Sequence, residues 1–203
     1  VMNPRINILT RTSNRPNAFR RCVESIKSQR YENLNHIVSV HNEKSYSYAT
    51  EMCENVIMVE EEAGAPQYGN NYKPYNIYIN KLMKEVEEGY IMFLDDDDLF
   101  TSSDSLKKIV PHLEEDCLLT WLVSCAGVLI PDKGSLMAPV LIPTCITASS
   151  FMFHSNHKWA ARWDAVRGAD YRCAQRLSWL LGHKWLHETI VTIPAASEGK
   201  KNG

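Results

Sequence analysis

Four consecutive carboxylates, Asp95 to Asp98, stand out among the ionisable side chains of this sequence. Neighbouring aspartates repel one another when they are ionised, so a fold that holds them together needs a positive charge beside them. Oxygen ligands of this kind suit Mg²⁺ or Mn²⁺, which commonly bind one or two carboxylates while substrate phosphates complete the coordination shell. In an extended segment Asp95 and Asp97 would share one direction, and Asp96 and Asp98 the other. The alternative is that the four aspartates form a solvated acidic turn with no chemical role.

The cysteines offer no second metal site. No pair has the C-x-x-C spacing, and no cysteines and histidines are spaced as zinc ligands. Buried thiols in a reducing compartment explain them, so we expect a cytoplasmic protein without disulfides. The cysteines lie at positions 22, 53, 117, 125, 145 and 173.

The aspartates follow directly on Tyr90 to Leu94, a short apolar run that predicts a strand buried on both faces. Earlier segments alternate between the two kinds of secondary structure. Strands are predicted at 5–9, 34–41 and 55–59, and helices from about Asn17 and from Pro74 to Gly89. This alternation predicts an α/β fold with a mainly parallel sheet covered by helices on both faces.

The second half is richer in predicted strands, so we expect the sheet to be mixed. A helix capped by Ser102 or Ser103 is predicted first. Strands are then predicted at 118–125, 127–130, 149–154 and 185–193, and a helix at 170–182 with Leu180 and Leu181 inward. In such sheets ligands bind beyond the carboxyl ends of the strands, where the aspartate run falls.

Length and composition are those of an ordinary globular chain, with 203 residues, a net charge of −2 and 44% hydrophobic residues. One domain, 1–203, is the default at this size. No apolar run approaches the ~20 residues of a membrane helix, and no leader pattern opens the chain, so we expect no membrane span. Nucleic-acid binding is not expected either. We interpret the polar run 197–203 as a tail or linker and expect a larger polypeptide.

Charge is unevenly distributed along the chain. Residues 1–150 are acidic on balance, and residues 151–203 are basic on balance. This asymmetry would suit an acidic metal site closed by a basic segment, although two differently solvated faces also explain it.

Four segments, in order over about half of the chain, resemble family 2 glycosyltransferases with the GT-A fold. Ile8 to Pro16 resembles the family's T-x-N-R-P opening, and Ser25 to Asn33 resembles the helix end "SI-x-x-Q-x-Y-x-N". Ile37 to Val40 matches the family's next strand. Tyr90 to Asp98 resembles its "YI-x-F-L-D-x-D-D" segment, the D-x-D motif that holds metal and nucleotide.

The resemblance implies roles for residues of the first half, about 1–100, which would bind the nucleotide sugar. Asp97 would be the principal ligand of Mn²⁺ or Mg²⁺, with Asp95 beside it. Asp95 and Asp96 would face the ribose and the metal. Asn76 matches an asparagine in the helix before the D-x-D strand. The residues expected to border the nucleotide are Thr10, Arg11, Thr12, Asn14 and Arg15.

The half from about 101 to 196 would bind the acceptor. Gly168 to Tyr171, with Arg176 after it, resembles the family's "E-D … R-L" element, which implies that Asp170 is the catalytic base of an inverting enzyme. A carboxylate there can take the proton of an attacking hydroxyl. Ala169 replaces the acidic residue often found before it, and a helix N-cap is the alternative role for Asp170.

Histidines and tryptophans complete the candidates. His41 stands where the family commonly has an aspartate that reads uracil, and a neutral imidazole can still accept from the ring N–H, so a uridine or thymidine donor remains possible. His154 and His187 are candidates to meet the diphosphate or metal, with ordinary structural roles as the alternative. Trp159 or Trp163 would stack on an acceptor sugar, with core packing as the alternative.

These features predict a metal-dependent glycosyltransferase that moves a sugar from a nucleoside-diphosphate sugar, a UDP-sugar by preference, to a hydroxyl of a glycan or glycoprotein. A phosphohydrolase is disfavoured because Leu99 replaces the Thr or Val of its D-x-D-x-T/V motif. A catalytically silent module that binds a sugar nucleotide or glycan stays open, because of Ala169 and His41. A viral origin is compatible with the small size.

Overall fold

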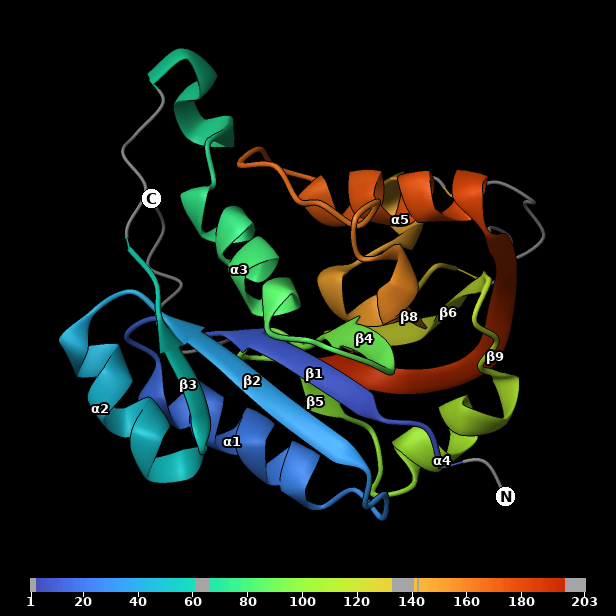
Figure 1. Ribbon diagram of the computed structural model, residues 1–203, viewed down its shortest axis with the longest axis horizontal. Helices are drawn as coiled ribbons and strands as arrows, with labels where there is room; N and C mark the ends of the chain where they lie inside the picture. Colours follow the sequence, from blue (N-terminus) through green and yellow to red (C-terminus); the bar gives the residue numbers. More distant parts are fainter. Residues whose placement is uncertain (1–2, 61–65, 133–140, 142, 196–203) are drawn as a thin grey trace.

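The computed structural model describes residues 3–60, 66–132, 141 and 143–195. Over these residues, nine strands form one curled sheet in the order β3-β2-β1-β4-β8-β6-β9-β5, with β7 paired to β6. Helices α1, α2 and α4 cover one face and α3 and α5 the other (Figure 1). The predicted α/β class, a mixed sheet between two helical layers, is confirmed. No helix among the described residues is long and apolar enough to cross a membrane.

The first half alternates strands and helices as predicted. Its elements are β1 (Ile6–Arg11), α1 (Pro16–Lys27), β2 (Leu34–Val40), α2 (Glu43–Met52), β3 (Asn55–Met58), the 3-10 helices η1 (Pro66–Asn71) and η2 (Pro74–Ile77), α3 (Tyr78–Lys84) and β4 (Tyr90–Phe93). Those of the second half are β5 (Leu99–Phe100), α4 (Ser105–Ile109), β6 (Cys117–Cys125), β7 (Val128–Ile130), η6 (Ala148–Ser150), β8 (Phe151–His154), α5 (Ala169–Leu180) and β9 (Gly182–Ile193).

Strand β1 lies at the point where the strand order reverses. It pairs in parallel with β2 on one side and with β4 on the other, so that Ile6 lies beside both Leu34 and Tyr90. The carboxyl ends of β1 and β4 are therefore neighbours. In open α/β sheets, such a switch point is where a crevice for ligands forms.

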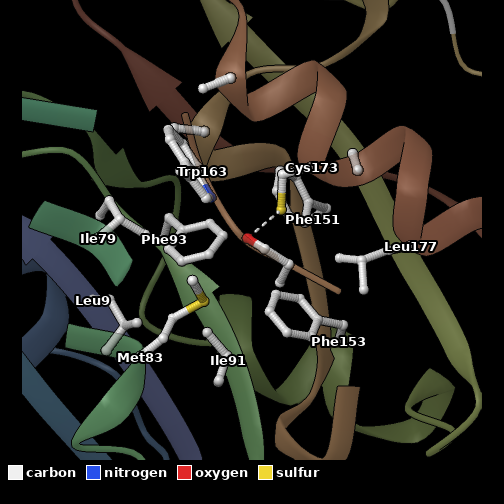
Figure 2. Packing of buried hydrophobic residues seen from close by; sticks show 14 of the residues in the cluster. Leu9, Ile79, Met83, Ile91, Phe93, Phe151, Phe153, Trp163, Cys173 and Leu177 are labelled. Atoms are coloured by element: carbon white, nitrogen blue, oxygen red, sulfur yellow. Dashed lines mark hydrogen bonds between the residues drawn. The ribbon is translucent and has the colours of Figure 1, made fainter. Parts of the chain in front are cut away.

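Apolar side chains that point alternately to the two faces of the sheet pack it against its two helical layers. Ile8 and Met92 pack with Cys22 of α1, where the predicted helical face is buried. Leu9 and Phe93 belong to the core beneath α3 and α5. In this core the Phe93 ring meets Trp163 edge to face, with centroids 5.1 Å apart (Figure 2). The sheet thus holds the ends of β1 and β4 rigidly on both sides.

Helix α3 ends five residues before Gly89, where we predicted its end. The chain must turn sharply into β4, and Gly89 has a φ of 87° with the Arg5 carbonyl so close that a Cβ would clash. The first turn of the predicted helix is the separate 3-10 helix η2, in which Tyr75 is 44% exposed.

Three boundaries of the second half also differ from the prediction. The N-cap of α4 is Asp104, not Ser102 or Ser103, whose carbonyls accept hydrogen bonds from Gln29 and Arg30 after α1. Strand β8 begins at Phe151, since Ser149 belongs to η6. Leu180 ends α5 and is 48% exposed instead of buried. The short β5 was not predicted, and the polar run 197–203 lies outside the described residues.

Candidate active site

The residues that follow β1 and β4 meet at the crevice. The Leu94 N–H donates to the Leu9 carbonyl (3.1 Å), which carries the pairing of β1 and β4 one residue beyond the strand. Arg11 then donates twice to Asp95, from Nε to Oδ1 (2.9 Å) and from Nη2 to Oδ2 (3.1 Å). The Asp98 N–H donates to the Asp95 carbonyl (2.9 Å), so the aspartates form a turn. The predicted extended segment, with two pairs of parallel carboxylates, is wrong.

Each aspartate of the turn has a different environment. Asp96 is fully buried, accepts a hydrogen bond from Thr12 Oγ1 (2.7 Å) and forms an ion pair with Arg15. Burial raises the pKa of Asp96 to about 7, although Arg15 and Thr12 oppose this shift. Arg15 Nη1 also donates to Asp97 Oδ2 (3.0 Å).

Asp98 turns toward the second half of the chain. Its Oδ2 accepts from Ser149 Oγ (2.5 Å), and burial raises the pKa of the Asp98 carboxyl well above its usual range. The nearby Asp95 adds to this shift. Sequence reasoning missed Ser149, because a lone serine before a strand carries no signal of its partner.

The aspartates fit a divalent cation that completes its shell with phosphate oxygens. Arg11 and Arg15 supply the expected positive charge, because Arg11 forms an ion pair with Asp95, and Arg15 forms ion pairs with Asp96 and Asp97. The described residues contain no cluster of three or more His, Cys, Asp or Glu that could hold a metal. Asp95 and Asp97 can therefore contribute only part of a coordination shell, as Mg²⁺ and Mn²⁺ sites on substrate phosphates require.

Two pockets adjoin this turn. The first, of about 370 Å³, includes Thr12, Arg15 and His41 and is called the His41 pocket below. The second, of about 390 Å³, includes Asp98, Trp163 and Asp170 and is called the Asp170 pocket. Four residues line both pockets: Arg11, Tyr75, Asp95 and Asp97. A ligand that spans both pockets must pass over these four, which we call the shared wall.

Asp170 lies in the first turn of α5, on the far side of the shared wall from His41. Gly168, with a φ of 81°, is the N-cap of α5, so the alternative N-cap role for Asp170 is wrong. Burial raises the pKa of the Asp170 carboxyl, the N–H of Tyr171 that donates to Oδ1 (2.9 Å) opposes this, and Asp95 adds to it. A carboxylate of raised pKa in a pocket is suited to accept a proton.

Arg11 is held in the shared wall from several sides. Its Nη1 donates to Asn76 Oδ1 (2.8 Å), and Asn76 Nδ2 donates to the Val166 carbonyl (3.1 Å). The guanidinium lies over the rings of Tyr75 (4.9 Å) and Trp163 (5.4 Å). Asn76 and Trp163 therefore position Arg11, and sequence reasoning missed Tyr75. The position of Tyr75 directly after Pro74, in the first turn of the predicted helix, was the sequence signal available for it.

His41 lies at the end of β2 and is half-buried. Its ring is 5.9 Å from that of Tyr78, and its Nε2 lies 3.3 Å from Asn42 Nδ2. Asn42 in turn caps α2 by accepting from the Ser45 N–H (2.8 Å). This cap fixes the backbone beside the His41 pocket.

Four sequence candidates lie near these loops but do not line either pocket. One is Asp96, which was expected to face the ribose and metal but is fully buried. Thr10 is fully buried, and its Oγ1 pairs with His36 Nε2 (2.9 Å) inside the sheet. Asn14 is exposed at a φ of 54°, and its N–H donates to Ser45 Oγ (3.0 Å). Arg176 donates to the carbonyls of Ala160 (3.2 Å) and Arg162, away from the aspartates.

His154, Trp159 and His187 lie away from both pockets. Because β8 runs antiparallel to β4, its carboxyl end places His154 beside Tyr90, at the opposite end of β4 from the aspartates. Trp159 is 69% exposed and follows Lys158, whose Nζ donates to the Val86 carbonyl (2.6 Å) before β4 begins. His187 is exposed on β9. Strand direction, which the residue pattern does not reveal, decides the place of His154.

The sequence matches one protein family. The model of the family described as "Glycosyl transferase family 2" matches residues 8–130, which include most of β1, all of β4 and the aspartate turn. No curated protein is matched by this chain.

Several solved structures share the fold. S. aureus TarS 1-349 in complex with UDP-GlcNAc has a TM-score of 0.67 at 13% identity, over 97% of this chain and 60% of that chain. Mannosyltransferase PcManGT from Pyrobaculum calidifontis, in complex with GDP-Man and Mn²⁺, has a TM-score of 0.67 at 15% identity, over 98% of this chain and 59% of that chain. The chain thus covers about three fifths of the length of these structures. At such identities the likeness shows the fold.

Proposed function

Because the chain belongs to glycosyl transferase family 2, we propose that it transfers a sugar from a nucleoside-diphosphate sugar to a hydroxyl of a glycan or glycoprotein. The observation that carries this proposal is the shared wall between the His41 pocket and the Asp170 pocket. The base and ribose of the donor occupy the His41 pocket, the diphosphate crosses Asp95 and Asp97, and the sugar enters the Asp170 pocket.

A UDP-sugar is the favoured donor. The neutral imidazole of His41 can accept from the N–H of a uracil ring. Arg15 and Thr12 hold the buried Asp96 behind this pocket, so the loop after β1 keeps its shape without a ligand. Neighbours of the same fold bind both UDP-GlcNAc and GDP-Man, so the donor base needs a direct test.

Mn²⁺ or Mg²⁺, held by Asp97 and Asp95, would stabilise the negative charge that develops on the departing nucleoside diphosphate. The hard carboxylate oxygens of Asp95 and Asp97, which both border the two pockets, support this assignment. Arg11 fixes the Asp95 carboxylate through two hydrogen bonds, so this ligand is oriented before the substrate arrives.

Asp170 acts as the general base. Its carboxylate removes the proton of the acceptor hydroxyl while that oxygen attacks the anomeric carbon from the side opposite the diphosphate, which inverts the configuration. The arrangement supports this role because Asp170 and the shared wall lie on the same pocket. Trp163 borders this pocket but is only 2% exposed. It packs on Phe93 in the core (Figure 2) with Arg11 over its ring, so it supports the shared wall and has no free face on which a sugar could stack.

A turnover screen tests the proposed function. UDP-, dTDP- and GDP-sugars are incubated with the protein, with and without Mn²⁺, and release of the nucleoside diphosphate is measured. We expect slow, Mn²⁺-dependent hydrolysis of one donor, a UDP-sugar. Binding of a sugar nucleotide without any turnover, even when glycan acceptors are added, would instead support a catalytically silent module.

A further inference from the structure

Two basic side chains, Lys73 and Arg167, line the Asp170 pocket but not the His41 pocket. They come from loops far apart in the sequence that are joined by backbone hydrogen bonds. The Lys73 N–H donates to the Ala165 carbonyl (2.7 Å), and the Arg167 N–H donates to the Asn71 carbonyl (2.9 Å). The two side chains are therefore carried by one continuous pair of chain segments at the pocket rim.

Hydrogen bonds from Arg172 of α5 fix the loop that carries Arg167. Arg172 donates to Asp164 from Nη2 (2.6 Å) and Nε (2.7 Å), and the hydrogen bond from Arg172 holds the pKa of Asp164 below its usual value. Arg172 Nη1 also donates to the Arg167 carbonyl (3.0 Å). The backbone at Arg167 is thus fixed before any ligand binds, which lowers the entropic cost of using its side chain.

The charges of Lys73 and Arg167 are not neutralised within the part of the chain that the structure describes. No carboxylate there forms an ion pair with either of them. Of the acidic residues of the same pocket, Asp95 pairs with Arg11, Asp97 with Arg15, and Asp98 accepts from Ser149, while Asp170 accepts the N–H of Tyr171. The N-terminus of α5 lies on the same pocket and adds partial positive charge.

We propose that Lys73 and Arg167 bind an anionic group, a phosphate or a carboxylate, carried by the acceptor or by the transferred sugar. The identity of this ligand rests on the proposed function, because the diphosphate of the donor is assigned to the shared wall. Both cations lie beyond that wall, on the side of Asp170. The planar guanidinium of Arg167 can bind two oxygens of such a group, and Lys73 supplies a second charge.

Titration of inorganic phosphate tests the site without any knowledge of the substrate. Phosphate binding is measured for the wild type, the double variant Lys73→Gln/Arg167→Gln, and the matched control Arg20→Gln on α1, under the opposite face of the sheet. We expect at least about tenfold weaker binding in the double variant and none of this loss in the control. No phosphate binding by the wild type, or equal binding by the double variant, would overturn the proposal.

A second arm separates the sources of the anion. The phosphate titration is repeated with saturating UDP and Mn²⁺, and we expect phosphate to bind alongside UDP. Displacement of phosphate by UDP would mean that the two cations hold the donor diphosphate, which overturns the proposal.

A preference for UDP-glucuronate over UDP-glucose that is lost in the double variant would assign the anion to the sugar. Acceleration of transfer by glycerol 3-phosphate acceptors, lost in the double variant, would assign it to the acceptor. Failure of UDP to bind would contradict the proposed function, while the first titration would still test the anion site.

Discussion

The two ends of the parallel strands are both polar, but they use their polar groups differently. At the amino ends, a pocket of about 460 Å³ is lined by asparagines of β1, β2 and β3 and by exposed glutamates. Asn55 donates to Asn35 (3.0 Å), Asn35 donates to Asn7 (2.9 Å), and Asn7 donates to the carbonyls of Glu88 (2.9 Å) and Tyr90 (3.1 Å). We call this row of neutral amides the asparagine ladder.

At the carboxyl ends, the polar groups are ionisable and largely buried. Burial raises the pKa values of Asp96 and Asp98, Arg11 pairs with Asp95, and Arg15 lies between Asp96 and Asp97. The ladder satisfies its own hydrogen bonds between neutral groups, whereas the shared wall places ion pairs beside two pockets. Pocket size therefore does not identify the site in this molecule. The site is identified instead by ionisable side chains with shifted pKa values and by ion pairs beside the pockets.

The largest expected effect is at Asp170. Replacement by Ala removes the proposed base, so transfer should fall about 10²–10⁴-fold, which is the usual contribution of a positioned general base. Binding of UDP with Mn²⁺ should stay within about twofold of the wild type, because Asp170 lies beyond the shared wall. Steady-state kinetics and calorimetry of the two proteins measure both quantities. Normal transfer by Asp170→Ala would show that another group is the base.

His36 lies on β2, between the two ends of the sheet, and should make the stability of the protein depend on pH. Burial lowers the pKa of His36 to about 4 from 6.5, with Lys27 adding to the shift. The unfolded chain thus binds the proton more tightly, so the contribution of neutral His36 is complete above pH 6.5 and is lost as pH falls toward 4. This contribution is about 1–3 kcal/mol.

Denaturant unfolding of wild type and His36→Gln between pH 7 and pH 4 checks this. The wild type should lose more stability over this range than the variant. His187→Gln, at an exposed histidine of β9, is the control and should follow the wild type. Parallel pH profiles of wild type and His36→Gln would contradict the account.

The shared wall itself is broken by Arg11→Gln. Asp95 loses both charge-assisted hydrogen bonds, so the free energy of unfolding should fall by about 2 kcal/mol. The affinity for UDP with Mn²⁺ should fall about tenfold, because Asp95 is no longer oriented. Arg20→Gln, on the exposed side of α1, is the matched control. An Arg11→Gln protein with unchanged affinity would remove Arg11 from the site.

The smallest effect is expected at the asparagine ladder. Asn35→Ala removes hydrogen bonds between neutral groups, which should lower the free energy of unfolding by about 1 kcal/mol. The affinity for UDP should stay within about twofold of the wild type. Chemical denaturation and calorimetry measure both. A marked loss of nucleotide binding in Asn35→Ala would mean that the two ends of the sheet are coupled.

Local patterns in the sequence were sufficient to predict most of the fold. Apolar residues at helical spacing predicted α1, and the run from Tyr90 predicted β4. Parallel pairing then explains why the Arg11 loop and the aspartate turn meet, since both follow neighbouring strands. Arg11, Thr12 and Arg15 donate hydrogen bonds directly to the aspartates of the turn, which is why the sequence indicated the place of the site.

The remaining features depend on tertiary structure. The direction of β8 decides that His154 lies at the wrong end of β4 for the site, and a strand's composition does not reveal its direction. Tyr75 and Ser149 reach the site because η2 and η6 turn toward it, and Asp98 finds its partner 51 residues away in the chain. Contacts of this kind have no local signal in the sequence.

Calorimetric titration of UDP, with and without Mn²⁺, into the wild type and Asp97→Ala tests the central claim most directly. We predict that Mn²⁺ tightens UDP binding to the wild type at least about tenfold, and that Asp97→Ala abolishes this difference. Asp104→Asn, which alters an exposed carboxylate paired with Arg30, should behave as the wild type. Equal UDP binding with and without Mn²⁺ in the wild type, or an Mn²⁺ effect that survives in Asp97→Ala, would contradict the assignment of the donor to the shared wall.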